Sequence, residues 1–398
     1  MTIEESVTRK PAKTRSQPTD SQERVVPFSE FCTVLENIEN TTKRLQITDY
    51  LKSYFVDIIK TAPSVLLPSV YLCVNSVGPE YEGLELGLGE SLLMKALGGA
   101  TGRTMQTVKA EARRLGDLGK VAEQSRNTQS TMFKPKPLTV QSVYKTLREI
   151  AQISGQNSNK FKIDKVQFLF VSGMNNEVKY VMRMLEGKLR IGLAAQSVLI
   201  ALAQATHATK YGKENDVTES VNNVKSVFNQ VPNFDIVIPK LLEVGPLEIS
   251  NHCTITPGIP LKPMLAHPTK SISQVLTRFE NIPFTCEYKY DGERAQIHYL
   301  DSGKISIYSR NLENMTQKYP DILNRISQII KPTTSSFILD CEVVAYNVKE
   351  DKIMPFQVLS TRKRKDVSVQ DIEVQVCLFA FDILLLNNQV SFINFSLF

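Results

Sequence analysis

The run CEYKYDGERAQIHYL holds the residues best suited to carry out chemistry. Lys289 ends an apolar and aromatic stretch that we predict to be a strand, and the turn residues Asp291 and Gly292 follow closely. A turn there would hold the lysine amine at the rim of a sheet instead of inside it. A lysine becomes a nucleophile only when it is deprotonated, which burial, a cationic neighbour or a bound metal ion would favour. The run therefore predicts a nucleophilic amine at Lys289.

Permanent positive charges and paired carboxylates accompany this lysine. Arg294 and Arg310 carry guanidinium groups, which can fork around phosphate or sugar oxygens better than a lysine can. In FILDCEVVAY, Asp340 and Glu342 lie on one side of a predicted strand, because side chains alternate along a strand. Two carboxylates in an otherwise apolar strand are costly unless a polar group, such as magnesium or a ribose, meets them.

An aromatic platform completes the set. Phe379 and Phe381 lie on one face of VCLFAFDILLL, and Phe381 could stack on a purine. Each element alone has a simpler explanation: a solvated lysine before a turn, an exposed strand face, core phenylalanines and, in TRKRKDV, a solvated loop. Together, a lysine nucleophile, arginines, a metal carboxylate and an aromatic platform suit nucleotidyl transfer.

Two kinds of element must position these residues. From Pro27 to about residue 253, apolar residues recur every third or fourth position, which predicts an all-α domain. From residue 254 to 388 a proline-punctuated stretch leads into short β-branched and aromatic runs, which predict an α+β domain with a mixed or antiparallel sheet. PFTCEYKY, AQIHYL, KISIYS, SFILDCEVVAY, MPFQVLS and VQVCLFAFDILLL are the expected strands, and DILNRISQII is an expected helix. Residues 1–26 are expected to form a disordered tail.

Composition restricts the class of protein but does not identify it. The 398 residues contain no apolar run long enough to cross a membrane and no secretory signal. The net charge of +6 permits a polyanionic partner without requiring one. The six cysteines and four histidines lack metal-ligand spacing, so we expect reduced thiols in an intracellular protein, with neither a zinc site nor disulfides.

Several long segments resemble a known family in the right order. TPGIPLKPMLAHPT, FTCEYKYDGERAQIH, IYSRN, KYPDI, SFILDCEVVAY, PFQVLSTRKRKDV and VQVCLFAFDILLLN are similar to the adenylation domain of eukaryotic replicative ATP-dependent DNA ligases, the ligase I type. GLELGLGESLLMKA, ATGR, VAEQSRNTQ and GKLRIGLAAQSVL resemble the DNA-binding domain of the same family. The resemblance covers about residues 27–388 and implies an enzyme that uses ATP and Mg²⁺.

The resemblance implies a role for each site residue. Lys289 would attack the α-phosphate of ATP to form lysyl-AMP; the AMP would pass to the 5′-phosphate of a nick, and the 3′-hydroxyl would displace it. Glu287 would contact the adenine edge, and Phe381 would stack on the base. The implied ATP-binding residues are Glu287, Lys289, Arg294, Arg310, Glu342 and Phe381. The implied metal ligands are Glu342, which would bind ribose or a catalytic Mg²⁺, and Glu313 and Glu85, which could share a second Mg²⁺.

Nicked double-stranded DNA is the implied macromolecular partner. Basic residues that precede expected helix starts suit backbone phosphates, since the first N–H groups of a helix are unpaired. The candidate DNA-binding residues are Arg103, Arg126, Lys188, Arg190 and Gly192. The alternative at each position is a capped helix with a solvated basic residue. Backbone contacts carry no base specificity, as an enzyme that seals nicks anywhere requires.

The chain departs from the family pattern near its end. After residue 387 the ending NQVSFINFSLF replaces the later lysine-containing motifs and the OB-fold domain, so we expect a C-terminally truncated chain in which residues 389–398 are a non-family tail. We expect DNA binding to persist and ligase activity to be weak or absent. A non-catalytic, nick-binding isoform of the ligase is the alternative.

Other classes and locations follow from the same pattern. An RNA ligase or mRNA capping enzyme would also use a nucleophilic lysine, but the long helical domain before it argues against both. The resemblance implies a nuclear enzyme of DNA replication, excision repair and recombination, acting as a monomer. The sequence contains no Q-x-x-[IL]-x-x-F-F motif, so it does not predict recruitment to a sliding clamp.

Overall fold

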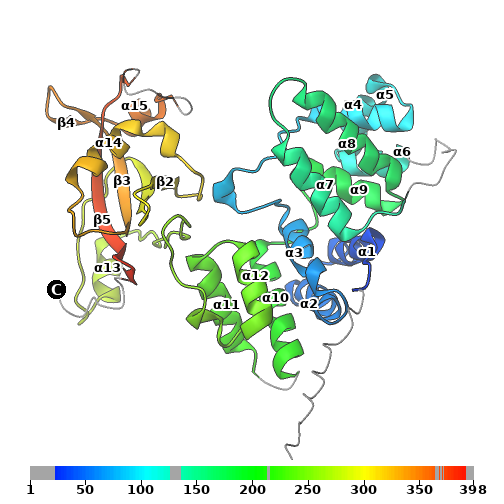
Figure 1. Cartoon of the computed structure of the whole chain (residues 1–398), viewed down its shortest axis with the longest axis horizontal. Helices are drawn as coiled ribbons and strands as arrows, with labels where there is room; N and C mark the ends of the chain where they lie inside the picture. Colours follow the sequence, from blue (N-terminus) through cyan, green and yellow to red (C-terminus); the bar gives the residue numbers. More distant parts are fainter. Residues whose placement is uncertain are drawn as a thin grey trace, which may run out of the picture.

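Two units follow one another along the chain, a helical unit and a sheet unit (Figure 1). The computed structural model describes residues 23–125, 136–212, 216–363, 367, 370 and 372–390. Residues 1–22, most of the expected disordered tail, lie outside the described residues, as do residues 391–398. Within the rest of the expected tail, Arg24 pairs with Glu30 and Asp57, and Val26 is buried. Packing in the helical unit therefore begins ahead of Pro27.

The helical unit confirms the helical spacing of the first half of the chain. Its helices are α1 (Phe28–Glu39), α2 (Arg44–Thr61), α3 (Leu66–Val74), α4 (Glu90–Thr101), α5 (Met105–Leu115), α6 (Leu118–Ser125), α7 (Val140–Gln152), α8 (Ser158–Ser172), α9 (Asn176–Leu185), α10 (Ala195–Tyr211), α11 (Thr218–Gln230) and α12 (Phe234–Val244). Short 3-10 turns are η1 (Pro63–Val65), η2 (Glu80–Glu82) and η4 (Ile249–Asn251). Buried apolar side chains from Val26 to Cys253 form one continuous core.

Helix α9 is the most deeply buried element of this unit. Every residue from Glu177 to Leu185 is buried, including Lys179 and Arg183. Charged side chains are almost never fully buried unless they are paired. The helix therefore depends on partners from its neighbours, and α1 and α6 pack against it.

The sheet unit is α+β with an antiparallel sheet, as predicted. Its strands are β1 (Glu293–Tyr299), β2 (Ile305–Ser309), β3 (Phe337–Asn347), β4 (Lys352–Ile353), β5 (Val376–Leu386) and β6 (Gln389–Val390). The order is β2-β1-β3-β5-β6, with β4 paired to β3. Its helical elements are α13 (Ile272–Arg278), η5 (Thr316–Lys318), α14 (Pro320–Ile329) and α15 (Phe356–Ser360). One sheet face packs through Ala295, Ile297, Cys341 and Val343 in a core with Ile322 and Ile326 of α14.

Two expected strands are wrong. Residues 283–290, the PFTCEYKY stretch, form no strand, and β1 begins only at Glu293. This stretch is exposed except at Tyr290 and pairs with no strand in the described part of the chain, so its apolar and aromatic residues alone do not make it a strand. MPFQVLS forms the short helix α15 instead, in which Leu359 is buried against the sheet.

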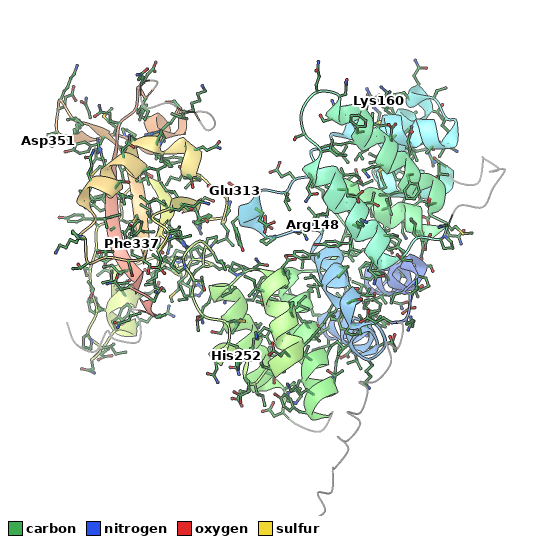
Figure 2. All side chains as sticks on the ribbon, viewed as in Figure 1. Arg148, Lys160, His252, Glu313, Phe337 and Asp351 are labelled. Carbon is green, nitrogen blue, oxygen red and sulfur yellow. The ribbon has the colours of Figure 1, made fainter. Side chains whose placement is uncertain are left out.

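A short segment after the helical unit ties the two units together. The Gln296 side chain accepts from the Leu261 N–H at 3.0 Å and donates to the Leu261 carbonyl at 2.6 Å. The buried His298 accepts from the Gly258 N–H at 3.0 Å. On the helical side, the ring of Tyr81 in η2 meets that of Tyr308 in β2 at 6.2 Å. Glu313 lies on the side of the sheet unit that faces the helical unit (Figure 2).

Candidate active site and nucleic-acid interface

Strand register gathers the candidate site residues on one face of the sheet. Arg294 of β1 lies opposite Glu342 of β3, and Glu342 lies opposite Phe379 of β5. Side chains directly opposite each other on antiparallel strands lie about 5 Å apart and interact. The predicted phosphate-binding arginine and the predicted metal carboxylate are therefore neighbours on this face.

Arg294 is held by a bidentate ion pair with Asp340. Its Nε donates to one carboxylate oxygen at 2.9 Å and its Nη2 to the other at 2.6 Å, while Nη1 donates to the Met264 carbonyl at 3.3 Å. The hydrogen bonds to Asp340 raise the pKa of Arg294. Arginine has more donors than these contacts use, so both terminal nitrogens keep an N–H for a ligand. Asp340 thus orients Arg294 while leaving it able to bind phosphate.

The predicted nucleophile lies beside Glu342. Burial raises the pKa of the Glu342 carboxyl, and the positive charges of Lys289 and Arg294 act in the opposite direction. The Gly292 N–H also donates to this carboxylate. A side chain at Gly292 would collide with the carbonyl oxygen of Val343, so only glycine lets the turn approach β3 so closely. The turn after Lys289 is therefore attached to the strand that carries Glu342.

Aromatic rings cover this face on the β5 side. The ring of Tyr290 stacks on that of Phe379 with centroids 3.8 Å apart. The guanidinium of Arg294 lies 5.5 Å from the centroid of the Phe381 ring. Cys341 pairs with Ala380 and Asp340 with Asp382, so Phe381 is the extra residue of a β-bulge. The bulge leaves Phe381 44% exposed beside Arg294, where a planar ligand could reach it.

Two further predicted residues of the sheet unit, Glu287 and Arg310, are exposed. Burial raises the pKa of Asp382, and the negative charges of Asp340 and Glu287 raise it further. Arg310 is exposed directly after the edge strand β2, with β1 between it and Glu342. Since Ser309 pairs with Ala295, Arg310 follows β2 at the end of the sheet where β1 begins with Glu293 and Arg294.

The candidate residues for the second metal line separate hollows. Glu313 borders a hollow of about 620 Å³ with Glu293 and Lys304. Glu85, in the helical unit, borders one of about 300 Å³ with Asn75 and Glu186. Glu313 and Glu85 therefore border different hollows.

One of the candidate DNA-binding residues precedes a helix as predicted. Arg103 comes just before α5, whose first turn is capped by the Thr104 hydroxyl. Its guanidinium pairs with Glu111 at 2.5 Å. Arg126 lies outside the described residues. The helix start expected after Arg126 also falls outside the described residues.

The loop with Lys188, Arg190 and Gly192 follows a helix end instead of starting a helix. The Lys188 N–H donates to the Arg183 carbonyl at 3.0 Å, which closes the last turn of α9. Helix α10 begins only at Ala195. The predicted helix N-terminus at these residues is therefore wrong, and any phosphate contact must come from their side chains and the loop backbone.

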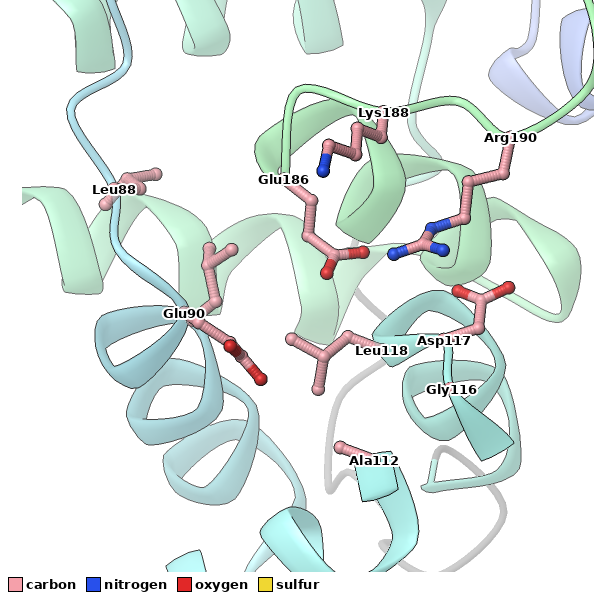
Figure 3. A pocket seen from close by; sticks show the side chains of 10 residues that line it. Leu88, Glu90, Ala112, Gly116, Asp117, Leu118, Glu186, Lys188 and Arg190 are labelled. Atoms are coloured by element: carbon pink, nitrogen blue, oxygen red, sulfur yellow. The ribbon is translucent and has the colours of Figure 1, made fainter. Parts of the chain in front are cut away.

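Lys188 and Arg190 border a hollow of about 430 Å³ between α4, α5 and α6 (Figure 3). Glu186 and Asp117 also border this hollow. The Arg183 side chain, with a smaller contribution from Arg190, lowers the pKa of Asp117. Burial raises the pKa of Glu186, and Arg190 acts in the opposite direction. The side chains of Lys188 and Arg190 are exposed. The two exposed cations therefore border the same hollow as the carboxylates of Asp117 and Glu186.

Comparison with known proteins agrees with both halves of the chain. Residues 27–203 match the family described as "DNA ligase N terminus", and residues 263–397 match "ATP dependent DNA ligase domain". The chain belongs to the ATP-dependent DNA ligase family.

The ligases to which the chain is similar include three proteins named DNA ligase 1. That of Schizosaccharomyces pombe is 50% identical over 368 residues, which are 91% of this chain and 48% of that protein. That of Saccharomyces cerevisiae is 48% identical over 92% of this chain and 50% of the relative, and that of Arabidopsis thaliana is 47% identical over 92% and 47%. The chain spans about half the length of these curated relatives.

The residues of this ligase chain fit a magnesium ion held largely by its nucleotide. No group of three or more histidine, cysteine, aspartate or glutamate side chains converges as a metal site in the part of the chain that the structure describes. Asp340 is committed to Arg294, which leaves Glu342 as the carboxylate beside Lys289. Magnesium takes one or two protein carboxylates and fills its remaining positions with water and phosphate oxygens. A single carboxylate, that of Glu342, is therefore compatible with a magnesium ion that its nucleotide largely holds.

Sequence reasoning missed two residues of this ligase site. Tyr290 stacks on Phe379, and Asp382 adds a carboxyl whose pKa burial raises. Tyr290 follows Lys289 directly, so its aromatic ring beside the nucleophile was the available signal. Asp382 gave no usable signal, since the bulge at Phe381 shifts the alternation of β5. No helix among the described residues is long and apolar enough to cross a membrane.

Proposed function

We propose that this ligase chain takes part in sealing nicks in duplex DNA, with AMP carried on Lys289. The observation that supports the proposal most directly is that Arg294 and Glu342 lie opposite each other on one sheet face, where the positive charge of Lys289 acts on the Glu342 carboxyl. A nucleophile, a carboxylate and a fixed guanidinium are the groups that nucleotidyl transfer requires. The family match supports the same reaction.

In the proposed first step, the lone pair of the Lys289 Nζ attacks the α-phosphorus of ATP. The bond from that phosphorus to the bridging oxygen breaks, and pyrophosphate leaves with the electron pair while the amine loses its proton to solvent. Arg294, oriented by Asp340, would bind phosphate oxygens and stabilise their growing charge. Phe381 would stack on the adenine, and Glu287 would border its edge. A magnesium ion on Glu342 would supply further charge neutralisation.

The later steps need a nicked duplex beside this site. AMP would move from Lys289 to the 5′-phosphate at the nick, and attack by the 3′-hydroxyl would then release it. Arg103, Arg126, Lys188, Arg190 and Gly192 would contact the phosphate backbone, as the match to the ligase N-terminal family supports. The setting would be nuclear replication, repair and recombination, with the ligase acting as a monomer.

The exposure of Lys289 favours a second proposal for this chain taken alone, namely nick binding with weak sealing. Lys289 lies on the unpaired stretch 283–290, whereas the helical unit has a continuous core. A nucleophile on a stretch without strand pairing is held less firmly in the geometry that displacement at phosphorus requires.

Transfer of AMP from α-labelled ATP tests the proposed reaction. The label should appear on the chain, more strongly in a longer ligase with the same residues, and Lys289→Ala should abolish it in both. Lys331→Ala, which removes an exposed lysine after α14, is the matched control and should label like the parent. Full labelling of Lys289→Ala would overturn the assignment of the nucleophile. Labelling of the chain as strong as that of the longer ligase would overturn the second proposal.

A further inference from the structure

A buried ionic network lies directly beneath the loop that carries Lys188 and Arg190. The side chain of Arg183 is 2% exposed. Its Nε and Nη2 donate to Asp117 at 3.2 and 2.7 Å, and Nη2 also donates to Glu39 at 2.9 Å. These contacts join α9 to α1 and to the start of α6. Such a set of charge-assisted bonds has little freedom to move.

The remaining arm of Arg183 reaches the loop itself. Its Nη1 donates to the carbonyl of Leu189 at 3.3 Å. Leu189 lies between Lys188 and Arg190 in the sequence, and its side chain is buried while theirs are exposed. Arg183 therefore holds the Leu189–Arg190 peptide, which leads directly into Arg190 and lies one residue after Lys188.

The loop adopts a backbone that would not persist unsupported. Gly187, Arg190 and Gly192 have φ values of 74°, 56° and 68°, all in the left-handed region. Glycine adopts this region freely, but arginine is disfavoured there because of its Cβ. A non-glycine residue keeps such a conformation only when its surroundings impose it.

Space for the network is also built into α6. The Asp117 carboxylate accepts from the Gly119 N–H at 2.9 Å, so it caps the first turn of the helix as well as pairing with Arg183. A Cβ at Gly119 would lie 2.8 Å from Arg183 Cγ and 2.8 Å from the Lys179 carbonyl oxygen. Glycine at this position is what permits α6 and α9 to approach closely enough for the pair.

We propose that Arg183 is a positioning residue for DNA binding, which fixes the 186–194 loop so that Lys188 and Arg190 both face the phosphate backbone. This inference rests on the proposed role of that loop in DNA binding. A buried ion pair by itself is weak evidence of a stabilising role, and replacement by apolar residues is often tolerated. The bond to Leu189 gives the pair a function that an apolar substitute could not reproduce.

The test is the salt dependence of nicked-duplex binding, measured in a cycle of variants. Each lost phosphate contact lowers the slope of log affinity against log salt by about 0.9. Lys188→Ala with Arg190→Ala should therefore reduce the slope by about 1.8 and weaken binding at least about tenfold. Arg183→Lys keeps the charge but cannot span Asp117 and Leu189, and it should give much of the same loss. When Arg183→Lys is added to the double variant, the affinity for the nicked duplex and the salt slope should change no further.

Lys179→Met is the matched control. Lys179 is a buried cation on the same helix that pairs with Glu39 at 3.3 Å, but the structure gives it no contact to the loop. This variant should keep the parental affinity and slope. If Arg183→Lys does not fold, as judged by circular dichroism, Gly119→Ala displaces Arg183 without removing a charge and takes its place in the cycle.

Two failures are distinguishable. If the double variant binds nicked DNA like the parent, the proposed role of the loop is wrong. If the double variant loses affinity but Arg183→Lys and Gly119→Ala bind like the parent, or their losses add to those of the double variant, then Arg183 does not position the loop. Inability of both Arg183→Lys and Gly119→Ala to fold would also overturn the inference, because Arg183 would then serve the fold as a whole.

Discussion

The two units contain similar arginine–aspartate pairs in different surroundings. Arg183 and Asp117 in the helical unit have side chains 2% and 9% exposed, whereas Arg294 and Asp340 in the sheet unit are 24% and 5% exposed. The first pair is enclosed by α1, α6 and α9. The second has its arginine at the surface of the sheet, beside the exposed ring of Phe381. The same kind of ion pair is thus enclosed by helices in one unit and borders the candidate site in the other.

The comparison indicates which part of the molecule is prepared for binding. In the helical unit, exposed cations stand on a loop held from below by buried groups. In the sheet unit, Arg294 and Glu342 are fixed on strands, but Lys289 lies on an unpaired stretch. We therefore expect DNA affinity to depend on the buried network and nucleotide transfer to depend on exposed groups.

The largest expected effect is on stability of the helical unit. Asp117→Ala leaves the Arg183 guanidinium buried with one carboxylate partner fewer and removes the cap of α6. Breaking a buried ion pair costs about 3–5 kcal/mol, so the free energy of unfolding should fall by about that amount. Urea denaturation followed by circular dichroism measures it. A loss below about 1 kcal/mol would contradict the view that this pair supports the fold.

Acid should act on the sheet unit through His298. Burial lowers the pKa of His298 to about 3 from its ordinary value of 6.5. Below pH 6.5 the His298 imidazole binds a proton in the unfolded chain but stays neutral in the folded chain. The contribution of the neutral imidazole to stability is therefore fully present above pH 6.5 and is lost as the pH falls toward 3. The loss should be about 1.4 kcal/mol per pH unit, or about 2 kcal/mol between pH 6.5 and 5.

The variant His298→Gln checks this dependence. Glutamine can still accept from the Gly258 N–H but does not titrate, so its unfolding free energy should change less with pH than that of the parent. His252→Gln, at an exposed position, is the control and should keep the parental dependence. Equal pH profiles for parent and His298→Gln would show that the buried imidazole does not limit the acid stability of this unit.

A smaller loss of stability is expected from the partly buried Arg294–Asp340 pair. Asp340→Asn removes the charge that orients Arg294 but keeps the shape of the side chain, and it should cost about 1–2 kcal/mol of stability. The rate of AMP transfer to Lys289 should fall by more than the loss of folded protein explains, because Asp340 would no longer hold the Arg294 guanidinium in place. The affinity for a nicked duplex should stay unchanged, because the candidate DNA-binding residues lie in the helical unit and this variant changes only the sheet unit. A stability loss equal to that of Asp117→Ala would break the comparison.

The smallest stability effect is expected at Phe381. Phe381→Leu removes an exposed ring, so the free energy of unfolding should change by less than about 0.5 kcal/mol. Loss of a stack worth about 1 kcal/mol should weaken ATP binding about fivefold, measured by calorimetry. Phe379→Leu is the contrasting variant, since its ring already stacks on Tyr290. If Phe379→Leu weakens ATP binding more than Phe381→Leu, the platform is misassigned.

Much of the fold could be predicted from the chain alone. The three- and four-residue spacing of apolar residues predicted helices such as α7, α9 and α10, and the structure confirms them. Alternation and β-branched content predicted β1, β2, β3 and β5. Both signals are local, so they need no knowledge of the partner element. They wrongly predicted strands at residues 283–290 and 354–360, because neither segment pairs with a neighbouring strand of the described chain as the prediction requires.

The candidate site was predicted in part. Arg294 and Glu342 lie opposite each other on one sheet face, and the positive charge of Lys289 acts on Glu342, while the roles of these residues stay predictions. The pairing of Arg294 with Asp340 and the contribution of Asp382 were not foreseen. Each depends on register or on a bulge, which the sequence does not encode locally.

The sequence by itself therefore determined which side chains could do chemistry and which segments could bury an apolar face, since both depend on residue type and spacing. Only the tertiary structure decided which charges are enclosed and which are free. Arg183 gave no signal in the sequence, because a buried arginine and a solvated one are the same residue until three helices close around it. Burial depends on elements distant along the chain, and that is why the supporting network could be recognised only after folding.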